Sequence, residues 1–475
     1  MFNKVVNKAL NIVQISVRDI GGGAERIAWG LYDAYRQLGL KSRFVVGYKF
    51  SNDPQLVRLP NQEYYSKWVR FWRDQGDNLS PYLTVRGAWQ LQALLYGLGQ
   101  PQRWINTQRG CEDFDFPGVW HLFESLTDLP DIVHCHTLHG GYFDLRALPW
   151  LSHRTHVILT LHDAWLMTGH CAYSFDCERW QSGCGQCPYL GTYPSLARDN
   201  TAYNWQRKQA ILTRSKIYIS TPSDWLMQKA VKSLLAPAIQ EARVIPNGID
   251  LSIFQPADQQ SAREALGLPQ NAAILLFVAN GIRHNSWKDY QTLRNCLALI
   301  AERASHQNLY LIALGEAGPS ERIGAAEIHF VPYQKNPQTI ARYYQSADLY
   351  LHAARADTFP TTVLEALGCG TPVIATAVGG IPEQIKSLEI GYSRLKGYSP
   401  QEATGILVAP GDAKQMAQSV LFLLNSPKLR RQLSDNAARD AQARFNLEQQ
   451  VNAYLEWYQQ IVNEPNQDKN ALSHS

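Results

Sequence analysis

The sequence predicts an α/β protein with two doubly wound parallel sheets, each covered by helices on both faces. Short apolar runs alternate with longer amphipathic segments along the chain of 475 residues, and this alternation is typical of parallel sheets. The apolar runs form two series that join near Pro246–Pro256. At about 150 residues per domain, the length also suits two or three domains. We therefore assign residues 1–250 to a first domain and 251–445 to a second.

Composition excludes several classes of protein. Hydrophobic residues make up 45% of the chain and charged residues 18%, as in ordinary globular proteins. The net charge of +4 is too even a balance for a nucleic-acid-binding protein. No apolar run is long enough for a transmembrane helix, and the first residues lack the pattern of a signal peptide. We expect a cytoplasmic protein, either free or in peripheral contact with the inner face of the membrane.

The first series of strands starts at residues 11–17. A helix is predicted directly after it, because apolar residues recur at helical spacing over 27–38, and it ends at Gly39. The further strands predicted in this series are 42–48, 131–136, 156–161, 216–220 and 242–246.

Residues 60–120 fit this alternation poorly and predict a helical insertion in the first domain. The segment is rich in tryptophan and arginine: Trp68, Trp72, Trp89, Trp104, Trp120, Arg70, Arg73, Arg86 and Arg103. In one interpretation the insertion simply packs on the first sheet. In the other, it presents an amphipathic face to a membrane or a lipid-linked substrate, because basic residues beside tryptophan suit anionic headgroups.

The second series of strands lies in the second domain, and a helix follows it. The predicted strands are 273–279, 308–314, 327–331, 348–352, 372–376 and 405–408. Residues 446–475 are expected to form a C-terminal helix that crosses back to the first domain, followed by a polar tail. Ligands of such sheets bind beyond the carboxyl ends of the strands, and the candidate binding residues below follow predicted strands.

A glycine loop separates the first strand from the first helix. Gly22 and Gly23 would let backbone N–H groups approach an anion at the helix N-terminus. A tight turn that needs positive φ explains these glycines equally well. The chain contains neither GxGxxG nor GxxxxGK[ST], so it lacks the dinucleotide and P-loop fingerprints.

Two cations follow the strand predicted at 273–279. Arg283 and Lys288 could clamp a diphosphate, the arginine through two parallel hydrogen bonds and the lysine as a point charge. The alternative is an ordinary solvated loop with a helix that starts near Lys288.

Two carboxylates follow the strand predicted at 348–352. Asp357 lies in the loop and Glu365 about one turn into the next helix, with the first helical N–H groups, those of Thr361, Thr362 and Val363, between them. Carboxylates accept hydrogen bonds from vicinal hydroxyls and free N–H groups bind phosphate, so the set suits a sugar nucleotide. The alternative is a capping box formed by Thr362-x-x-Glu365.

Four of the eight cysteines crowd into a loop at 165–190: Cys171, Cys177, Cys184 and Cys187. Four thiolates with a Cys-x-x-Cys pair predict a closed tetrahedral zinc site of structural type. Unligated buried thiols, an iron–sulfur cluster and redox disulfides are the alternatives, and the adjacent His170 could replace one ligand. The other cysteines stand alone and are interpreted as buried thiols: Cys111, Cys135, Cys296 and Cys369.

The segment from Asp357 to Ala375 resembles the E-x7-E segment of family 4 glycosyltransferases. Other stretches of the chain resemble the same family, in the order in which the family has them: the glycine loop Gly21–Arg26, VIPNGID (244–250), Arg283-x4-Lys288, GGIPEQ (379–384) and GILVAPGD (405–412). The resemblance implies the GT-B fold, in which two Rossmann-like domains face a cleft, with the acceptor on the side of the first domain and the donor held mainly by the second.

The resemblance also implies roles for individual residues. Glu365 would bind the ribose hydroxyls of a nucleotide-sugar donor, Asp357 the hydroxyls of the transferred sugar, and Arg283 with Lys288 the diphosphate. His162, at the end of a buried strand, would reach the transferred sugar, although such a histidine is more often structural. Transfer would retain the anomeric configuration by front-face attack, without a catalytic metal.

Two positions depart from the family pattern. Asp357 stands where glutamate is commoner, which shortens its reach. Asp289 follows Lys288 where glycine is usual, so a close backbone approach at that point is in doubt.

We therefore expect a retaining hexosyltransferase that moves a sugar from a nucleoside-diphosphate sugar to a saccharide or lipid-linked acceptor. HTLHGGYF (136–143) and the stretch from His162 to Pro188 resemble members of the family associated with exopolysaccharide or O-antigen assembly. The alternatives are an epimerase or oxidoreductase of the Rossmann type, which would need the missing GxGxxG, and a non-enzymatic, zinc-stapled glycan-binding module.

Overall fold

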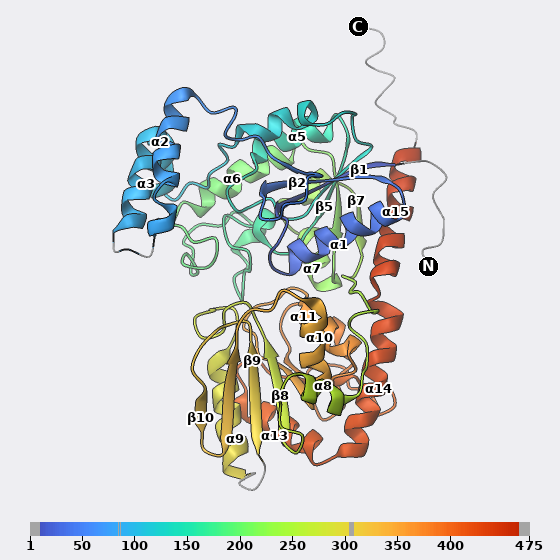
Figure 1. Ribbon diagram of the computed structural model, residues 1–475. Coiled ribbons are helices and arrows are strands. Elements are labelled where there is room, and N and C mark those ends of the chain that lie inside the picture. Colours follow the sequence, from blue (N-terminus) through green and yellow to red (C-terminus); the bar gives the residue numbers. More distant parts are fainter. Residues whose placement is uncertain (1–9, 84, 86, 304–307, 465–475) are drawn as a thin grey trace. The chain divides into compact units, whose positions relative to one another are not determined.

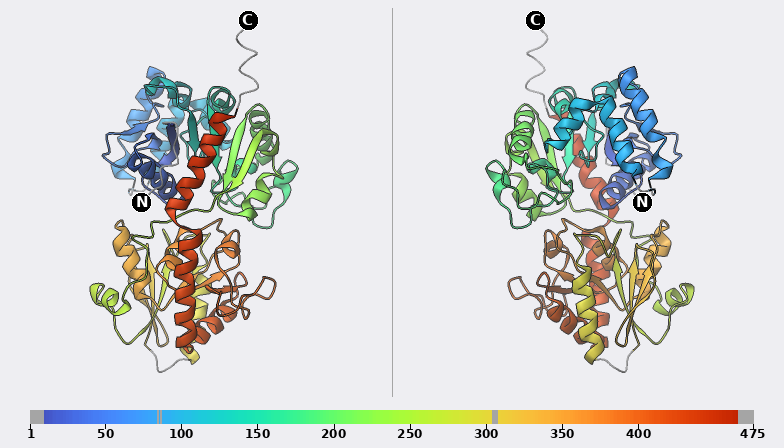
Figure 2. Two further views of the ribbon diagram at one scale, coloured as in Figure 1. Left: turned by 90° about the vertical axis from the view of Figure 1, so that its right-hand side faces the viewer. Right: turned by 90° about the vertical axis from the view of Figure 1, so that its left-hand side faces the viewer.

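The computed structural model describes residues 10–83, 85, 87–303 and 308–464 of the chain. It divides into two compact units, each described by itself below (Figures 1 and 2). Unit 1 takes the chain up to Thr221, Leu226–Val244 and the residues from Ala453 onward, and unit 2 takes Pro222–Trp225 and Ile245–Asn452. The polar tail expected after the last helix lies outside the described residues.

Unit 1 is built on a seven-stranded sheet in the order β3-β2-β1-β4-β5-β6-β7, and every pair of neighbouring strands is parallel. The strands are β1 (Asn11–Arg18), β2 (Lys41–Tyr48), β3 (Leu56–Arg58), β4 (Ile132–Cys135), β5 (His156–Thr160), β6 (Ile217–Thr221) and β7 (Ile239–Val244). The chain builds the sheet outward from β1 to one side and then, from β4 on, to the other. The order therefore reverses between β1 and β4.

The longer helices of unit 1 follow its strands: α1 (Gly23–Gln37), α2 (Lys67–Asp77), α3 (Ala88–Gly99), α4 (Pro101–Gln108), α5 (Leu148–Ser152), α6 (Thr201–Leu212) and α7 (Asp224–Ala230), whose first two residues belong to unit 2. In α1 the predicted apolar stripe is buried, including Ile27 and Leu31. The helix ends before Gly39, whose φ of +76° continues the chain in a left-handed turn that glycine tolerates best.

The segment 60–120 is helical, as the sequence predicts. It forms α2, α3 and α4, and α2 and α3 pack side by side at the periphery of unit 1 (Figure 1). The Ser66 side chain caps α2 by accepting a hydrogen bond from Val69 N. None of the helices among the described residues combines the length and apolar character needed to cross a membrane.

Unit 2 repeats the same strand order with its own seven strands, β10-β11-β9-β8-β12-β13-β14. They are β8 (Ala273–Val278), β9 (Leu309–Leu314), β10 (Glu321–Ile323), β11 (Ala326–Val331), β12 (Leu349–His352), β13 (Val373–Thr376) and β14 (Gly405–Val408). Only β10, at the edge, is antiparallel to its neighbour among these pairs. The reversal of order falls between β8 and β12.

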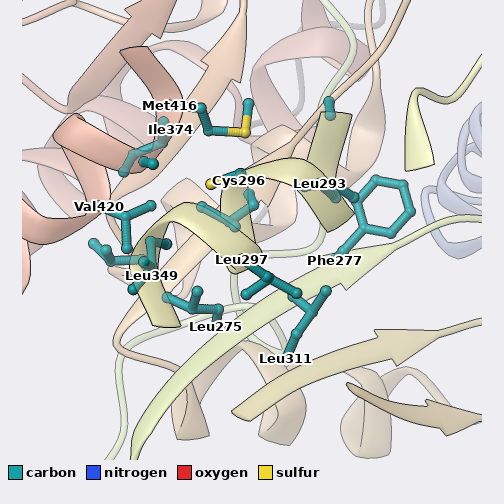
Figure 3. Close-up of a cluster of buried hydrophobic side chains, with 14 of the residues drawn as sticks. Leu275, Phe277, Leu293, Cys296, Leu297, Leu311, Leu349, Ile374, Met416 and Val420 are labelled. Atoms are coloured by element: carbon teal, nitrogen blue, oxygen red, sulfur yellow. The ribbon is translucent and has the colours of Figure 1, made fainter. Parts of the chain in front are cut away.

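The helices after α7 all begin in unit 2: α8 (Gln259–Ala265), α9 (Tyr290–Arg303), α10 (Pro337–Ser346), α11 (Thr361–Gly368), α12 (Ile381–Gln384), α13 (Ala413–Leu424), α14 (Pro427–Arg444) and α15 (Leu447–Asn463). Of these, α9 and α13 pack on one face of the sheet and α10, α11 and α14 on the other. Leu293 and Leu297 of α9 and Val420 of α13 pack with Leu275 and Leu311 in one buried cluster (Figure 3). A second cluster joins the opposite side chains of the strands to α10, α11 and α14. Apolar side chains on both faces of the sheet are therefore packed against helices, as a doubly wound sheet requires.

Helix α15 contributes residues to both units, since unit 1 includes it from Ala453 onward. Tyr454 and Tyr458 reach the unit 1 sheet through buried polar contacts: the Tyr454 hydroxyl lies 2.8 Å from Thr160 Oγ1, and the Tyr458 hydroxyl lies 2.6 Å from His134 Nδ1. These contacts hold the C-terminal part of α15 on β4 and β5.

The sequence missed two strands and misplaced a third. β3 and β10 have three residues each and stand at sheet edges, so they show no apolar run long enough to mark them. β7 starts at Ile239, three residues before the predicted strand, and its side chains are only partly buried for the same reason. The other predicted strands agree with the structure to within one or two residues at each end.

Candidate functional site

The candidate site of unit 2 lies at the carboxyl ends of β8 and β12, where the strand order reverses. Neighbouring loops diverge at such a point and leave a crevice in which open α/β sheets bind ligands. Lys288 comes from the loop after β8, and Asp357 comes from the loop after β12. The two strands are neighbours in the sheet, so the two loops begin side by side.

Lys288 and Asp357 form a close ion pair. Lys288 Nζ lies 2.5 Å from Asp357 Oδ2, and His352 Nε2 lies 3.4 Å from the same oxygen. The two loops are also joined through their backbones, because Lys288 and Ala354 form a β-bridge and Arg355 N donates to Trp287 O at 2.9 Å. The ion pair is therefore held by main-chain hydrogen bonds as well as by its charges.

The charges at this pair are fixed near neutral pH. Burial by itself would raise the pKa of Asp357, but the Lys288 ammonium and His352 hold it well below its usual range. Burial, together with the positive charge of Lys288, lowers the pKa of His352 to about 4. Asp357 is thus an ionised hydrogen-bond acceptor and His352 a neutral imidazole, whose Nδ1 lies 2.9 Å from the Tyr350 hydroxyl.

The glycine turn after β13 packs directly against Asp357. Gly379 has φ +57°, and a Cβ at this position would lie 1.8 Å from the carbonyl oxygen of Asp357. A Cβ on Gly380 would lie 2.3 Å from Thr358 O, which accepts a hydrogen bond from Gly380 N at 2.9 Å. Only glycine lets the turn approach this closely, and the approach fixes the position of the Asp357 backbone.

Arg283 is paired with a carboxylate that the sequence analysis did not single out. Its Nε lies 2.5 Å from Glu316 Oε1, and its Nη2 donates to Ala317 O at 3.0 Å. The backbone amides of Ile282 and Arg283 also donate to Glu316. Burial would raise the pKa of Glu316, but these hydrogen bonds and the arginine charge lower it to about 2. Glu316 could have been recognised in the sequence as a candidate site residue, because it lies just after the strand β9.

Glu365 is buried on α11 with 3% of its surface exposed, and the Tyr344 hydroxyl donates to its Oε2 at 2.9 Å. The capping-box alternative is wrong. Helix α11 begins at Thr361 after Pro360, which has no side chain that can cap, so Thr362 is already inside the helix. The amide of Val363 donates to Pro360 O at 3.3 Å, whereas the amides of Thr361 and Thr362 precede the first intrahelical hydrogen bonds.

Asp289, the departure from the family pattern after Lys288, has a structural role. Its carboxylate accepts from the backbone and side chain of Thr292, at 3.2 and 2.7 Å, and thereby caps the start of α9. Arg355 pairs with the same carboxylate at 3.4 Å.

Unit 1 places a group of histidines at the carboxyl ends of β4 and β5. His136 Nδ1 lies 3.1 Å from His162 Nε2, and His136 Nε2 lies 2.7 Å from Gln14 Oε1. With the carbonyl oxygen of Gln14 as acceptor, His136 donates from Nε2 and accepts at Nδ1, so His162 carries its proton on Nε2. His162 lines a small pocket with His139 and Asp163, whose side chains lie 2.6 Å apart.

Burial keeps the imidazoles of His134, His136 and His162 neutral. It lowers the pKa of His162 to about 4, that of His134 to about 3, and that of His136 well below its ordinary value. Within this group only His162 is assigned a role from the sequence. His136, His139 and Asp163 lie in stretches that resemble the family as a whole and give no role to single residues.

The glycine loop after β1 lacks the positive φ angles that the tight-turn alternative needs. None of Gly21, Gly22 and Gly23 has positive φ, so the positive-φ alternative is wrong. Gly22 is the N-cap of α1, with no side-chain cap. The loop thus leaves the first amides of α1 without a capping side chain, as an anion site at a helix N-terminus requires.

The four clustered cysteines line one pocket together with His170. No disulfide joins any cysteine among the described residues. Of the cysteines that stand alone, Cys135, Cys296 and Cys369 are buried as predicted, whereas Cys111 is half-buried and accepts a hydrogen bond from Asn200 Nδ2 at 3.1 Å.

Two sequence families match the chain in succession. "Glycosyltransferase Family 4" matches residues 21–253, and "Glycosyl transferases group 1" matches residues 258–440. A protein of Escherichia coli strain K12, described as "Putative colanic acid biosynthesis glycosyl transferase WcaC", is 25% identical over 470 residues. The similarity to WcaC covers 95% of this chain and all of that protein.

Solved structures of glycosyltransferases share the fold. HepE of Anabaena, in complex with UDP and glucose, superposes with a TM-score of 0.60 at 15% identity, over 95% of this chain and 100% of HepE. WaaG, a glycosyltransferase involved in lipopolysaccharide biosynthesis, superposes with a TM-score of 0.57 at 17% identity, over 96% of this chain and 100% of WaaG. At these identities the likeness shows the fold, which is the GT-B arrangement of two Rossmann-like domains.

We predict that the folded chain loses stability as the pH falls from 7.5 to 5.5. His134, His136, His162 and His352 stay neutral in the folded state because burial lowers their pKa values, but they bind protons near pH 6.5 when unfolded. Since the unfolded state binds more protons, the free energy of unfolding should fall by about 4 kcal/mol between pH 6.5 and 5.5. Urea denaturation at each pH measures it.

The Asp357 carboxylate does not contribute to the loss of stability between pH 7.5 and 5.5, because its lowered pKa makes it titrate at far more acidic pH. His352→Gln should reduce the pH slope, whereas His153→Gln, at an exposed position, should leave it unchanged. A stability that is constant from pH 7.5 to 5.5 would contradict the neutral state of the buried histidines.

Proposed function

Because the chain belongs to family 4 of the glycosyltransferases, we propose that it transfers a sugar from a nucleoside-diphosphate donor to a saccharide or lipid-linked acceptor in cell-surface polysaccharide assembly. The observation that carries the proposal is the Lys288–Asp357 pair at the reversal of strand order in unit 2, beside the N-terminus of α11. The names of WcaC and WaaG favour polysaccharide assembly, and the UDP and glucose bound to HepE favour a nucleotide-sugar donor.

In this proposal the donor diphosphate binds to Lys288, Arg283 and the first amides of α11. Lys288 has three N–H donors, of which Asp357 takes one, so the ammonium can contact a phosphate while keeping its carboxylate partner. Arg283 engages Glu316 through Nε and Ala317 through Nη2, and 30% of its side chain stays exposed. Gly22 and Gly23 of unit 1 would supply further backbone donors.

The carboxylates bind hydroxyls. Glu365, oriented by Tyr344, would accept from the ribose of the donor, and Asp357 would accept from the transferred sugar. Asp357 is ionised near neutral pH, so it cannot act as a general acid there. His162 would contact the transferred sugar as a neutral imidazole.

Transfer proceeds with retention in this proposal. The leaving diphosphate gains negative charge as the bond to the anomeric carbon breaks, and Lys288, Arg283 and the α11 amides stabilise that charge most in the transition state. A phosphate oxygen of the leaving group takes the proton of the attacking acceptor hydroxyl. These two cations provide the stabilisation that other transferases obtain from a divalent metal, so the reaction needs no catalytic metal.

We place the enzyme at the inner face of the membrane, in contact through the insertion 60–120. More than half of the exposed large hydrophobic side chains among the described residues lie in this segment, with Trp68 58% and Trp89 62% exposed on neighbouring helices α2 and α3. The insertion as a whole contains six lysines and arginines and six aspartates and glutamates. Its basic surplus is confined to residues 66–109, which contain all six basic residues, including Arg86 outside the described residues, against two aspartates. Apolar side chains beside basic ones suit an anionic bilayer surface.

We predict that Asp357→Asn and Glu365→Gln each lower kcat/KM sharply while the chain stays folded. Each change removes a charged acceptor of a sugar hydroxyl at nearly constant volume, and the expected loss is about 2–4 kcal/mol, or roughly 30- to 1,000-fold. Steady-state transfer with UDP-, GDP- and ADP-sugars measures it. The exposed Glu402→Gln is the matched control and should keep full activity. Near-full kcat/KM for Glu365→Gln would refute the ribose role.

Arg283→Ala and Lys288→Ala should weaken binding of a nucleoside diphosphate more than binding of the matching nucleoside. The reason is that each cation contacts phosphate and neither contacts the base. Isothermal calorimetry with both ligands gives the difference, and thermal denaturation of each variant checks that it is folded. Equal losses for the two ligands would point to a folding defect and contradict the phosphate role.

The double variant Trp89→Ser with Leu94→Ser should lower binding to vesicles that contain anionic phospholipid by at least roughly tenfold, because it removes two apolar contacts from the exposed surface of α3. Co-sedimentation measures the bound fraction. Phe422→Ser, which removes an exposed aromatic side chain from unit 2, should bind like the natural chain. Equal binding of the double variant and the natural chain would refute membrane contact through the insertion.

A further inference from the structure

The cysteine loop of unit 1 gathers four thiols around one small cavity. Cys171, Cys177, Cys184 and Cys187 line it together with His170, whose Nε2 lies 3.3 Å from Cys187 Sγ. The cavity has a volume of about 20 Å³, close to the space that a single water molecule needs. A space of this size admits one ion but no organic cofactor.

The backbone around the Cys184-x-x-Cys187 pair is held in an unfavourable conformation. Four successive residues have positive φ: Gly183 (+149°), Cys184 (+54°), Gly185 (+96°) and Gln186 (+47°). Two of them are not glycine, and such residues adopt this region only where the surroundings enforce it. The turn brings both cysteines of the pair to the same cavity.

Little regular structure supports this turn. Between Thr168 and Thr201 the only helix or strand is the 3-10 turn Arg179–Gln181. A loop of more than thirty residues with so little secondary structure is uncommon in a compact domain. No disulfide holds it together among the described cysteines.

Burial raises the pKa values of the Cys171, Cys184 and Cys187 thiols, and hydrogen-bond donors and cations around the cavity partly offset this effect. The amide of Gly169 donates to Cys184 Sγ at 3.2 Å. Two largely buried ammonium groups interact electrostatically with the thiols, Lys208 with Cys171 and Cys184, and Lys229 with Cys171 and Cys177. Lys208 also forms an ion pair with Glu112, so its positive charge acts on this carboxylate as well as on the thiols.

We propose that Cys171, Cys177, Cys184 and Cys187 bind one Zn²⁺ as a tetrathiolate, structural site. Zinc prefers four sulfur ligands in a closed tetrahedral site, and Cys-x-x-Cys is a common spacing for two of them. Binding replaces the four thiol protons, which pass to solvent, and leaves a site with a net charge of two minus beside Lys208 and Lys229. The site has no part in the transfer chemistry of the proposed function.

Zinc binding requires the thiols to converge further. Over the part of the chain that the structure describes, no three Cys, His, Asp or Glu side chains already meet at metal-binding geometry. All four cysteines line the same cavity, so zinc would draw their thiols together through rotation about the Cα–Cβ bonds and shifts of the loop. His170 remains outside the ligand set and supports Cys187.

The zinc site would also brace the histidine group of unit 1. Ala164 N donates to Ala172 O at 2.8 Å, and Lys208 Nζ donates to Trp165 O and Thr168 O. These bonds connect the cysteine loop to the segment that carries His162 and Asp163. Loss of zinc would therefore loosen the segment after β5 and lower transfer activity only as the loop loosens.

The test is the metal content of the full chain, purified under reducing conditions without chelator or metal-affinity tag. Inductively coupled plasma mass spectrometry should find about one zinc per chain, since four thiolates hold one ion. Cys184→Ser and Cys187→Ser should each lower the zinc content to background and lower the melting temperature. Cys111→Ser, which alters a half-buried cysteine of the same unit outside the cluster, should keep both.

Cobalt substitution keeps the proposal testable if a serine variant fails to fold. The natural chain loaded with Co²⁺ should show the absorption of tetrahedral cobalt with a thiolate-to-metal charge-transfer band, and His170→Asn should leave that spectrum unchanged. Transfer activity should survive brief exposure to EDTA and decline only as zinc is lost. Folded, reduced chain without zinc, with iron in place of zinc, or with zinc retained in the Cys184 and Cys187 variants would overturn the proposal, whatever its transfer activity.

Discussion

The ion pair between Lys288 and Asp357 is the constraint on which the unit 2 site depends. The two residues belong to loops that leave neighbouring strands in different directions, and their charges, with the backbone bridge beside them, hold the loops together. The pair sums to zero charge, which makes its burial tolerable. Gly379 can approach Asp357 because it has no Cβ, and the neutral His352 fills the space below the carboxylate without adding charge.

Unit 1 has the same strand order but different chemistry at its carboxyl ends. Burial keeps His134, His136 and His162 neutral, and a hydrogen-bond chain runs from Gln14 through His136 to His162. Unit 2 offers paired charges, whereas unit 1 offers neutral buried imidazoles together with the Asp163 carboxylate beside His139. The sheets place the loops, and the side chains of the loops set the electrostatics of each site.

Two elaborations of unit 1 fall outside the alternation of strand and helix. The insertion of α2, α3 and α4 leaves large apolar side chains exposed. Exposed apolar patches of this kind are typical of surfaces that bind a membrane or another protein. The cysteine loop is irregular and strained near Cys184, and such a backbone suits a cross-link. Each feature is costly for an isolated chain, and each has a physical explanation in the partner proposed for it, a membrane surface in one case and a zinc ion in the other.

The sequence by itself determined the two parallel sheets and the candidate residues that follow their strands. Continuous apolar runs identify buried strands, and Lys288, Asp357 and Glu365 were found because ligands bind where such strands end. Only the tertiary structure decided which groups pair. Glu316 lies 33 residues from Arg283, and Gln14 lies 122 residues from His136, so their contacts depend on strand order. The short edge strands β3 and β10, the Pro360 start of α11 and the convergence of four thiols on one cavity likewise follow from packing between distant segments, which residue periodicity does not encode.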